Sequence, residues 1–282
     1  MLTINPKKIP VPKLHYYLLG SVGPRPIAFA STIDKEGNRN LAPFSFFNVF
    51  SANPPILVFS PARSGRTNTT KNTYDNVKEV SEVVINVVSY DMVHQMSLTS
   101  SPFEAGVDEF IKSGFTPISS ETIRPFRVKE SPVQIECEVL EVKELGQNGG
   151  AGNLVICEVK RIHISESVLD ESNMVDQKKI DLVSRMGGNW YCRADGNSMF
   201  EVDKPITTIG IGVDALPEKI RLSNSLTGND LGILGNMQEL PGEELQNKYL
   251  DEISENLDLH LAKSFLHKNQ VEKAYAILEK VL

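Results

Sequence analysis

The side chains best suited to binding and chemistry lie in three short segments between residues 20 and 73. The first segment places Arg25 and the hydroxyl pair Ser31-Thr32 at the two ends of one apolar run. The second, residues 40–48, mixes amides, a hydroxyl, a proline and three aromatic rings. The third, residues 63–73, supplies three cations and ends in a predicted helix start. Such a set suits a ligand that is flat at one end and anionic at the other.

A planar heterocycle with a phosphate tail is one such ligand. It needs flat apolar walls, a few polar groups for the ring edges, and cations with hydroxyls for the phosphate. A helix that starts near Lys71 would add unpaired N–H groups and a partial positive charge. The alternative is that the aromatic rings form a core and that the hydroxyls only cap helices. Residue types alone leave both interpretations open.

The overall composition argues against two other classes of partner. The 282 residues carry a formal net charge of −7, and the basic residues are scattered singly among acids. Nucleic acids and anionic membranes require clustered Lys and Arg, so neither is expected as a partner. The first residues lack the apolar run of a signal peptide, and no stretch approaches the ~18 apolar residues of a membrane span. We therefore expect a soluble cytoplasmic protein.

The cysteines do not predict a disulfide framework or a metal site. There are three, Cys137, Cys157 and Cys192, with no CxxC spacing. An odd number without close pairs is typical of reduced, mostly buried thiols. No histidine lies near any two of them in sequence, so no zinc site is predicted.

Strand patterns dominate the first two thirds of the chain. Apolar, partly β-branched runs predict strands at residues 26–31, 55–60 and 83–88. From residue 133 to 139 apolar and polar residues alternate, and the apolar register then jumps to Leu140 and Val142, which predicts a bulge. A glycine-rich loop at 146–153 then predicts a hairpin with a strand at 154–164. Many strands with few helices favour a mostly β protein built on a closed antiparallel barrel.

Helices are expected in three places. One covers residues 72–80, with Asn72 or Thr73 as its N-cap, and one lies near residues 91–98. Within residues 242–282, apolar residues at helical spacing predict two amphipathic helices with a break near Lys268-Asn269. Their apolar faces suggest that this part of the chain docks on the barrel or on a second subunit.

A dinucleotide-like pattern occurs at Gly210-Ile211-Gly212-Val213-Asp214-Ala215. A true fingerprint of this kind opens a long helix between parallel strands. Here Pro217 follows at once, so we expect no nucleotide at this position. The glycines are better explained by a strand that lies close to another backbone.

Several motifs in order resemble those of the flavin reductase-like family, the FMN-binding split barrels that include flavoredoxin. They read GSVGPRPIAFAST at residues 20–32, NLAPFSFFNVFSANPP at 40–55, KNTYDNV at 71–77 and VVINVV at 83–88. The resemblance continues through CEVKRIHI at 157–164 and VSRMGGNWY at 183–191. It implies a six-stranded antiparallel FMN-binding split barrel over residues 1–205, and residues 206–282 are then a C-terminal, mainly helical extension. It also implies a homodimer with FMN near the subunit interface.

The resemblance assigns roles to individual residues around the FMN. Residues matching Arg25, Ser31, Thr32, Ser45, Phe46 and Phe47 line the ring and the ribityl chain. Residues matching Lys71 and Thr73 hold the phosphate, and Asn72 stands where the family often has Asp. We also include Asn40, Ala42 and Asn72 in the cofactor-binding set, and the backbone N–H groups of residues 42–47 are suitable donors to the ring edge.

Three further residues are candidates for the substrate side. Arg185 lies beside two glycines and the Trp190-Tyr191 pair, so it is placed to close over a flavin and meet a nicotinamide phosphate or ribose, or else to form an interface ion pair. Tyr191 is included with it. His163 lies in a strand pattern, where a structural histidine is the usual finding. No catalytic side chain is predicted, because a flavin carries its own redox chemistry.

The function expected from this resemblance is transfer of electrons from NAD(P)H, through bound FMN, to free flavin or another acceptor. Two alternatives remain open from the sequence. One is a flavoredoxin-like carrier that a protein partner reduces, and the other is a non-catalytic FMN-binding or sensing protein.

Overall fold

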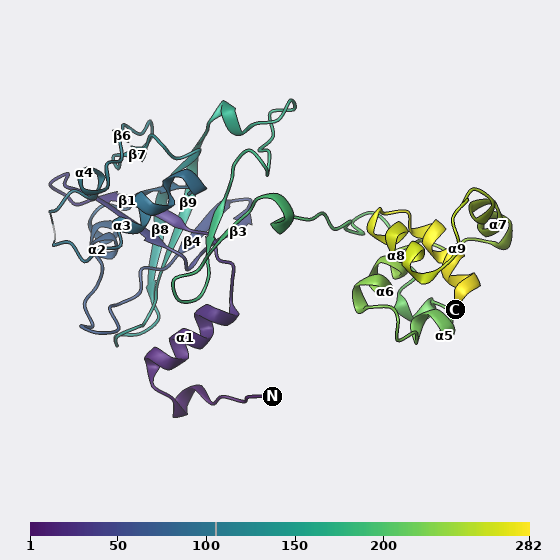
Figure 1. Cartoon of the computed structure of the whole chain (residues 1–282). Helices are drawn as coiled ribbons and strands as arrows, with labels where there is room; N and C mark the ends of the chain where they lie inside the picture. Colours follow the sequence, from purple (N-terminus) through teal and green to yellow (C-terminus); the bar gives the residue numbers. More distant parts are fainter. Residues whose placement is uncertain (105) are drawn as a thin grey trace. The chain divides into compact units, whose positions relative to one another are not determined.

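One curved sheet organises the first part of the chain (Figure 1). Within residues 1–104 and 106–282, which this computed structural model describes, the sheet has seven antiparallel strands in the order β2-β1-β5-β8-β9-β4-β3. Their bounds are β1 Ala28–Ile33, β2 Arg39–Phe44, β3 Phe47–Ala52, β4 Pro55–Phe59, β5 Glu82–Asn86, β8 Val133–Glu144 and β9 Asn153–Ile164.

The sheet is a split barrel, because its two end strands are neighbours in sequence. β2 and β3 lie at opposite ends of the strand order, yet only Ser45 and Phe46 separate them along the chain. The sheet must therefore curve until its two edges meet at this connection. The described sheet has seven strands, one more than the six that the resemblance implied, and residues 39–52 form two of them, β2 and β3. We call the Ser45-Phe46 connection and the strand ends beside it the seam.

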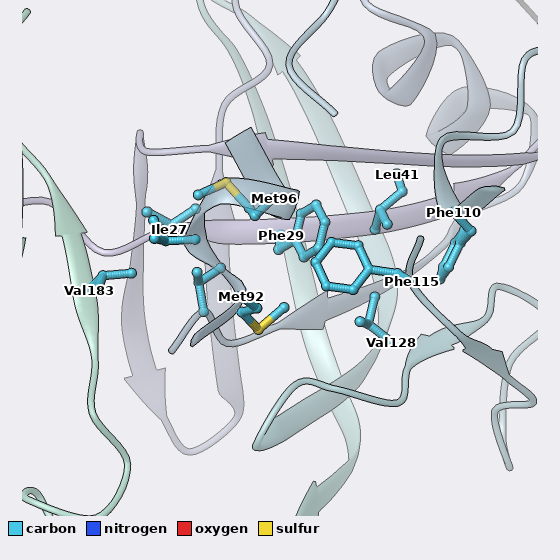
Figure 2. Packing of buried hydrophobic residues seen from close by; sticks show 11 residues of the cluster. Ile27, Phe29, Leu41, Met92, Met96, Phe110, Phe115, Val128 and Val183 are labelled. Atoms are coloured by element: carbon cyan, nitrogen blue, oxygen red, sulfur yellow. The ribbon is translucent and has the colours of Figure 1, made fainter. Parts of the chain in front are cut away.

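Two apolar clusters pack on the two faces of β1, whose six residues are all buried. On one face Phe29 meets Phe115 edge to face, with ring centroids 5.3 Å apart. Met92, Met96 and Phe110 complete that cluster (Figure 2). On the other face Ala28 and Ala30 join a cluster that includes Val77 of α2, Asn72–Glu79. β1 is thus held from both sides, and its polar residues are fixed with it.

The predicted hairpin of β8 and β9 is confirmed, with its bulge. The ladder between the two strands shifts register between Val139 and Glu141, close to the jump seen in the sequence, and again between Glu136 and Cys137. Cys137 and Cys157 are free and buried, as expected of reduced structural thiols. Burial raises the pKa of Cys137 to about 12.

The start of α2 differs from the expectation. The N-cap is Lys71, and no side chain makes a capping hydrogen bond there. Asn72 and Thr73 are instead the first two helical residues, and Thr73 is buried. The hydroxyl of Thr73 accepts a hydrogen bond from Asn40 rather than turning back to cap the helix.

Shorter elements complete this part of the chain. They are η1 Pro6–Lys8, α1 Val11–Ser21, η2 Tyr90–Met92, α3 Val93–Leu98, α4 Glu109–Ser113, β6 Pro117–Ile118, β7 Arg127–Val128, η3 Glu166–Val168, β10 Val183–Arg185, β11 Tyr191–Arg193 and η4 Gly196–Ser198. The helix expected near residues 91–98 is η2 followed by α3. None of the described helices is long and apolar enough to cross a membrane.

The chain divides into two compact units, residues 1–200 and residues 201–282. The second unit is helical (Figure 1). Its elements are η5 Val213–Ala215, α5 Glu218–Arg221, α6 Gly228–Gly235, α7 Glu243–Asp251, α8 Leu259–His267 and α9 Val271–Val281. The break at residues 268–270 is where the sequence placed it, but residues 252–258 introduce a second break, so the described structure has three helices after residue 242 instead of two.

The apolar faces of these helices are buried within the second unit itself. Ala274, Ile277 and Leu278 of α9 are fully buried in a cluster with Ile220 of α5 and Leu234 of α6. The inference that these faces require the barrel or a second subunit as a packing surface was therefore wrong. The unit supplies its own core.

The glycines of the dinucleotide-like pattern lie in a loop, not in a strand. Ile211 and Gly212 donate backbone hydrogen bonds to the carbonyls of Met237 and Gly235, at 2.8 and 2.9 Å. A side chain at position 210 would meet the Gly235 carbonyl oxygen at 2.5 Å. Close backbone approach explains these glycines, as the sequence suggested.

Candidate functional site

The seam brings the aromatic segment to one place on the barrel. Ala42 is half-buried on β2, and Ser45 and Phe46 form the connection to β3, which begins at Phe47. The Phe46 carbonyl accepts a hydrogen bond from the Ser60 N–H at 2.9 Å, which anchors the connection to the end of β4. Phe46 itself remains 41% exposed. The seam therefore offers an accessible ring beside backbone that is fixed at both ends.

Arg25 is a buried clamp next to the seam. One terminal nitrogen donates to the carbonyls of Leu19, at 2.7 Å, and of Val22, and the other donates to the Met186 carbonyl at 2.9 Å. Its Nε lies 3.5 Å from the Ser45 hydroxyl oxygen. Arg25 thus joins the end of α1, the β10 segment and the seam. In this arrangement it shapes the site and adds positive charge, with its terminal N–H groups directed to carbonyls.

Arg185 and Tyr191 are brought together beside Arg25. The backbones of Arg25 and Arg185 exchange two hydrogen bonds of 3.0 and 2.8 Å. The Arg185 guanidinium lies 4.6 Å from the centre of the Tyr191 ring and donates to the Trp190 carbonyl at 2.8 Å. Burial, with a contribution from the nearby positive charge of Arg185, lowers the pKa of Arg25. Two adjacent guanidiniums make this end of the site attractive to an anionic or electron-rich group.

A second group of predicted residues forms a buried polar network. The side-chain amide of Asn40 donates to the hydroxyls of Thr32, at 3.2 Å, and of Thr73, at 2.8 Å. Asn76 donates to the same Thr32 hydroxyl at 3.1 Å. The network joins β1, β2 and the first turns of α2. Sequence reasoning missed Asn76, although its place three residues after Thr73 puts it on the same helical face.

Ser31 lies on the opposite face of β1 from Thr32, since successive side chains of a strand alternate. It is fully buried, and its hydroxyl oxygen has no hydrogen-bond partner within the described residues. The structure therefore separates the two hydroxyls that the sequence treated as a pair. Only Thr32 belongs to the network with Asn40 and Thr73.

The start of α2 has the character of an anion site. Lys71 is exposed at the N-cap, where side-chain oxygens are normally preferred because they accept from the first N–H groups. An ammonium cannot accept such a bond, and it adds charge to the positive end of the helix. Asn72, the next residue, is half-buried. Within the described residues no side chain caps this start, and the carboxylate of Asp75 in the first turn accepts from the Thr70 hydroxyl at 3.0 Å. An anionic group would supply the missing capping acceptor.

The loop before α2 is held by its own side chains and by the β8–β9 hairpin. Arg63 donates from Nε to the Asn68 side-chain oxygen at 2.9 Å and from Nη2 to the Asn68 carbonyl at 2.6 Å. Its backbone exchanges hydrogen bonds with Gly150 and Ala151 at 3.0 and 2.8 Å. Arg63 therefore builds the loop, whereas Arg66 and Lys71 remain exposed.

His163 lies in a separate cluster of charged groups. Its Nε2 is 2.7 Å from the fully buried carboxylate of Glu136, and its Nδ1 is 3.8 Å from Glu121. Burial alone would raise the pKa of Glu136, but hydrogen bonds from Thr122, the Glu121 and Thr122 backbone and His163 lower it to about 2. Within the described residues, none of these contacts links His163 to the seam or to Arg185.

α1 lies along the same side of the barrel as the seam. The ring of His15 meets Phe46 edge to face, with ring centroids 6.3 Å apart. A Cβ at Gly150, at the hairpin tip, would lie 3.2 Å from the side chain of Val11. None of the residues of α1 is buried, although Tyr16 and Leu18 are apolar. The helix thus leaves an apolar surface open next to Phe46.

Comparison with known proteins shows which family the part of the chain with the seam and α2 resembles. A family model described as "Flavin reductase like domain" matches residues 20–181. An uncharacterized protein of Aquifex aeolicus (strain VF5) is 36% identical over 189 residues, which are 67% of this chain and 94% of that protein.

Two solved structures extend the comparison. Nitrilotriacetate monooxygenase component B from Bacillus cereus is 31% identical, with a TM-score of 0.67 over 72% of this chain and 98% of that chain. The 2-nitrobenzoate 2-nitroreductase NbaA of Pseudomonas fluorescens is 26% identical, with a TM-score of 0.66 over 75% of this chain and 100% of that chain. All three similar proteins are nearly fully covered, whereas at least a quarter of this chain lies outside each match.

Proposed function

The chain belongs to the flavin reductase-like family, and from this premise we propose that it binds FMN between the seam and the start of α2. In the proposed reaction, electrons pass from NAD(P)H through the FMN to free flavin or another acceptor. The proposed activity is thus that of an oxidoreductase, with NAD(P)H as its electron donor and free flavin or another molecule as its acceptor.

The observation that carries the proposal is the uncapped start of α2. Lys71 stands where a capping oxygen is expected, and Thr73 beside it has a buried hydroxyl. A phosphate would accept from the first helical N–H groups, from the ammonium and from the Thr73 hydroxyl together. One phosphate position is what FMN requires, so we propose FMN rather than FAD.

The seam suits the ring end of FMN. Phe46 and Phe47 offer apolar surface for a ring system, and the edges of β2 and β3 offer backbone groups that no neighbouring strand occupies. Thr32 is buried on the network side of β1, bonded to Asn40 and Asn76, and we propose that the ribityl chain runs along this side of the strand. The donors, rings and cations present are therefore those that FMN needs.

When bound, the flavin would supply the hydride and electron transfer chemistry, so the protein needs no nucleophile. Phe46 and the apolar seam would hold the ring and exclude water from one face. The buried guanidinium of Arg25, whose Nε lies 3.5 Å from the Ser45 hydroxyl oxygen, would stabilise negative charge at the seam end of the site. Arg185 and Tyr191, stacked on each other, would orient a nicotinamide nucleotide over the open face.

We also propose that the working form is a homodimer. Val49 and Phe50 on the edge strand β3 are 64% and 68% exposed, and Trp190 is 77% exposed. Tyr16 and Leu18 of α1 are exposed as well, and exposed apolar side chains of this kind are typical of a surface that a partner covers. A second copy would cover this surface and enclose the flavin.

A spectroscopic titration tests the proposed function. We expect the purified protein to be yellow or to take up FMN, and acid to release FMN rather than FAD. Anaerobic addition of NADH or NADPH should bleach the flavin band, and added free flavin should restore it with turnover. A protein that fails to bind FMN would refute the proposal. Binding without bleaching by either nicotinamide would favour a carrier reduced by a protein partner.

A further inference from the structure

We propose that Asn68 is a positioning residue that fixes the start of α2 for the phosphate of FMN. It lies in a turn at residues 63–69, in the loop before α2, and joins this turn to the tip of the β8–β9 hairpin, residues 145–152. The inference rests on the proposed function, because it concerns the site that we assign to the phosphate. Asn68 acts on the ligand only through the loop that leads to Lys71. The hairpin tip then helps to distinguish FMN from a flavin that has no phosphate.

Asn68 uses each of its polar groups to close the turn and to tie it to the hairpin. Its side-chain amide nitrogen donates to the Gln147 carbonyl of the hairpin tip at 3.1 Å. Its side-chain oxygen and its carbonyl accept from the Arg63 guanidinium at 2.9 and 2.6 Å. Its N–H donates to the Ser64 carbonyl at 2.9 Å. The φ angle of Asn68 is 56°, in the left-handed region that Asn adopts more readily than most residues with a side chain.

The hairpin tip approaches the turn closely at Gly149. A Cβ there would lie 3.0 Å from the Ser64 carbonyl oxygen and 3.2 Å from the Gly65 carbonyl oxygen, which is tighter than most Cβ contacts in proteins. The φ angle of Gly149 lies outside the left-handed region, so the closeness of the turn, rather than the hairpin backbone, explains this glycine. Together with the backbone hydrogen bonds of Arg63 to the same tip, this contact fixes where the turn lies on the hairpin.

The loop passes this constraint to the start of α2. The Ser64 N–H donates to the Thr69 carbonyl at 2.9 Å, which closes the turn just before the helix. The Thr70 hydroxyl then donates to the carboxylate of Asp75, in the first turn of α2, at 3.0 Å. Lys71 comes next, exposed at the N-cap. An exposed lysine is placed mainly by its backbone, so the loop decides where its ammonium and the first helical N–H groups lie.

Two variants loosen the turn from the hairpin in different ways. Asn68→Gly keeps the left-handed backbone accessible and removes the side-chain hydrogen bonds to Gln147 and Arg63. Gly149→Ala keeps Asn68 and pushes the Ser64 carbonyl away from the hairpin. In a fluorescence titration of the apoprotein, Asn68→Gly should weaken FMN binding about fivefold and Gly149→Ala about threefold.

A flavin without the phosphate separates positioning from general damage. Riboflavin affinity should change by less than about twofold in both variants, because Ser60 anchors the seam from outside the turn. Gly146→Ala is the matched control, since a Cβ there would meet the Ala151 side chain at 3.3 Å, within the hairpin itself. It should change neither affinity by more than about twofold. Thermal unfolding checks that each variant is folded, and either Asn68→Gly or Gly149→Ala decides the question alone should the other not fold.

The possible results lead to different conclusions. Equal losses for FMN and riboflavin, or unchanged FMN affinity in Asn68→Gly, would overturn the positioning role. A loss of FMN affinity in Gly146→Ala as large as that in Gly149→Ala would overturn it as well. A wild-type protein that binds no FMN in the same titration would instead refute the proposed function.

Discussion

Lys71 provides the most direct test of the proposed phosphate site. If its ammonium pairs with the FMN phosphate, Lys71→Ala removes a charge-assisted hydrogen bond, which contributes ~1.5–3 kcal/mol. Lys71 is exposed at the helix start, so solvent and salt screen the pair and the lower end of that range applies. We therefore expect the dissociation constant for FMN to rise about tenfold.

The assay is fluorescence titration of the apoprotein with FMN and, separately, with riboflavin. Riboflavin has no phosphate, so its affinity should change by less than about twofold. Lys78→Ala is the matched control, because Lys78 lies in the last turn of the same helix and pairs with Glu144 at 3.4 Å, away from the helix start. Wild-type affinity for FMN should also weaken with added salt.

Two results would refute the reasoning. Equal losses for FMN and riboflavin in Lys71→Ala would indicate damage to the fold instead of a lost phosphate contact. Unchanged FMN affinity would show that Lys71 is a solvated residue that does not contact the phosphate, and a bound phosphate would then no longer explain the missing cap of α2.

Three further outcomes are expected. The pKa of Glu136 is about 2 in the folded chain, below its ordinary 4.5, so the ionised carboxylate stabilises the fold above pH ~4.5. The free energy of unfolding should fall by up to about 3 kcal/mol as the pH is lowered toward 2; urea unfolding across that range should show this, and Glu136→Gln should remove this part of the pH dependence. Residues 201–282 expressed alone should unfold cooperatively in circular dichroism, because they contain their own core; a non-cooperative melt would contradict this. Arg185→Ala should raise KM for the nicotinamide about tenfold with little change in kcat or FMN affinity, and loss of FMN binding instead would assign Arg185 to the flavin.

The strand pattern was readable from the sequence because burial imposes it locally. Apolar and polar residues alternate along the first half of β8, where Gln134 and Glu136 on the polar face are buried as well. The bulge after Val139 leaves Leu140 exposed and returns Val142 to the cluster that holds Val139. The helix break near Lys268 was also predictable, because the buried apolar faces on either side of it leave a local pattern in the sequence. The second break at residues 252–258 was not, since Ile253 and Leu257 continue the helical spacing through it and pack in the same core.

The site was predictable as a list of residues but not as an arrangement. Ser31 and Thr32 are adjacent in sequence, yet strand alternation puts them on opposite faces, and only Thr32 meets Asn40. Arg25 stays a predicted ligand of the flavin, and its terminal N–H groups donate to the carbonyls of Leu19 and Met186. The contacts of Thr32 with Asn76 and of Arg25 with Met186 join residues 44 and 161 positions apart, and no local pattern contains them.

Two positions on the free edge of β2 offer no N–H group to a ligand. Residues 41 and 43 share one direction along the strand, pointing away from β1. The N–H of Leu41 is taken by the buried carboxylate of Glu109 at 3.0 Å, and burial raises the pKa of that acid. Pro43 has no N–H. Ser45 follows in the connection to β3, where the Arg25 Nε lies 3.5 Å from its hydroxyl oxygen, and its N–H is the backbone donor that we propose for the flavin ring edge.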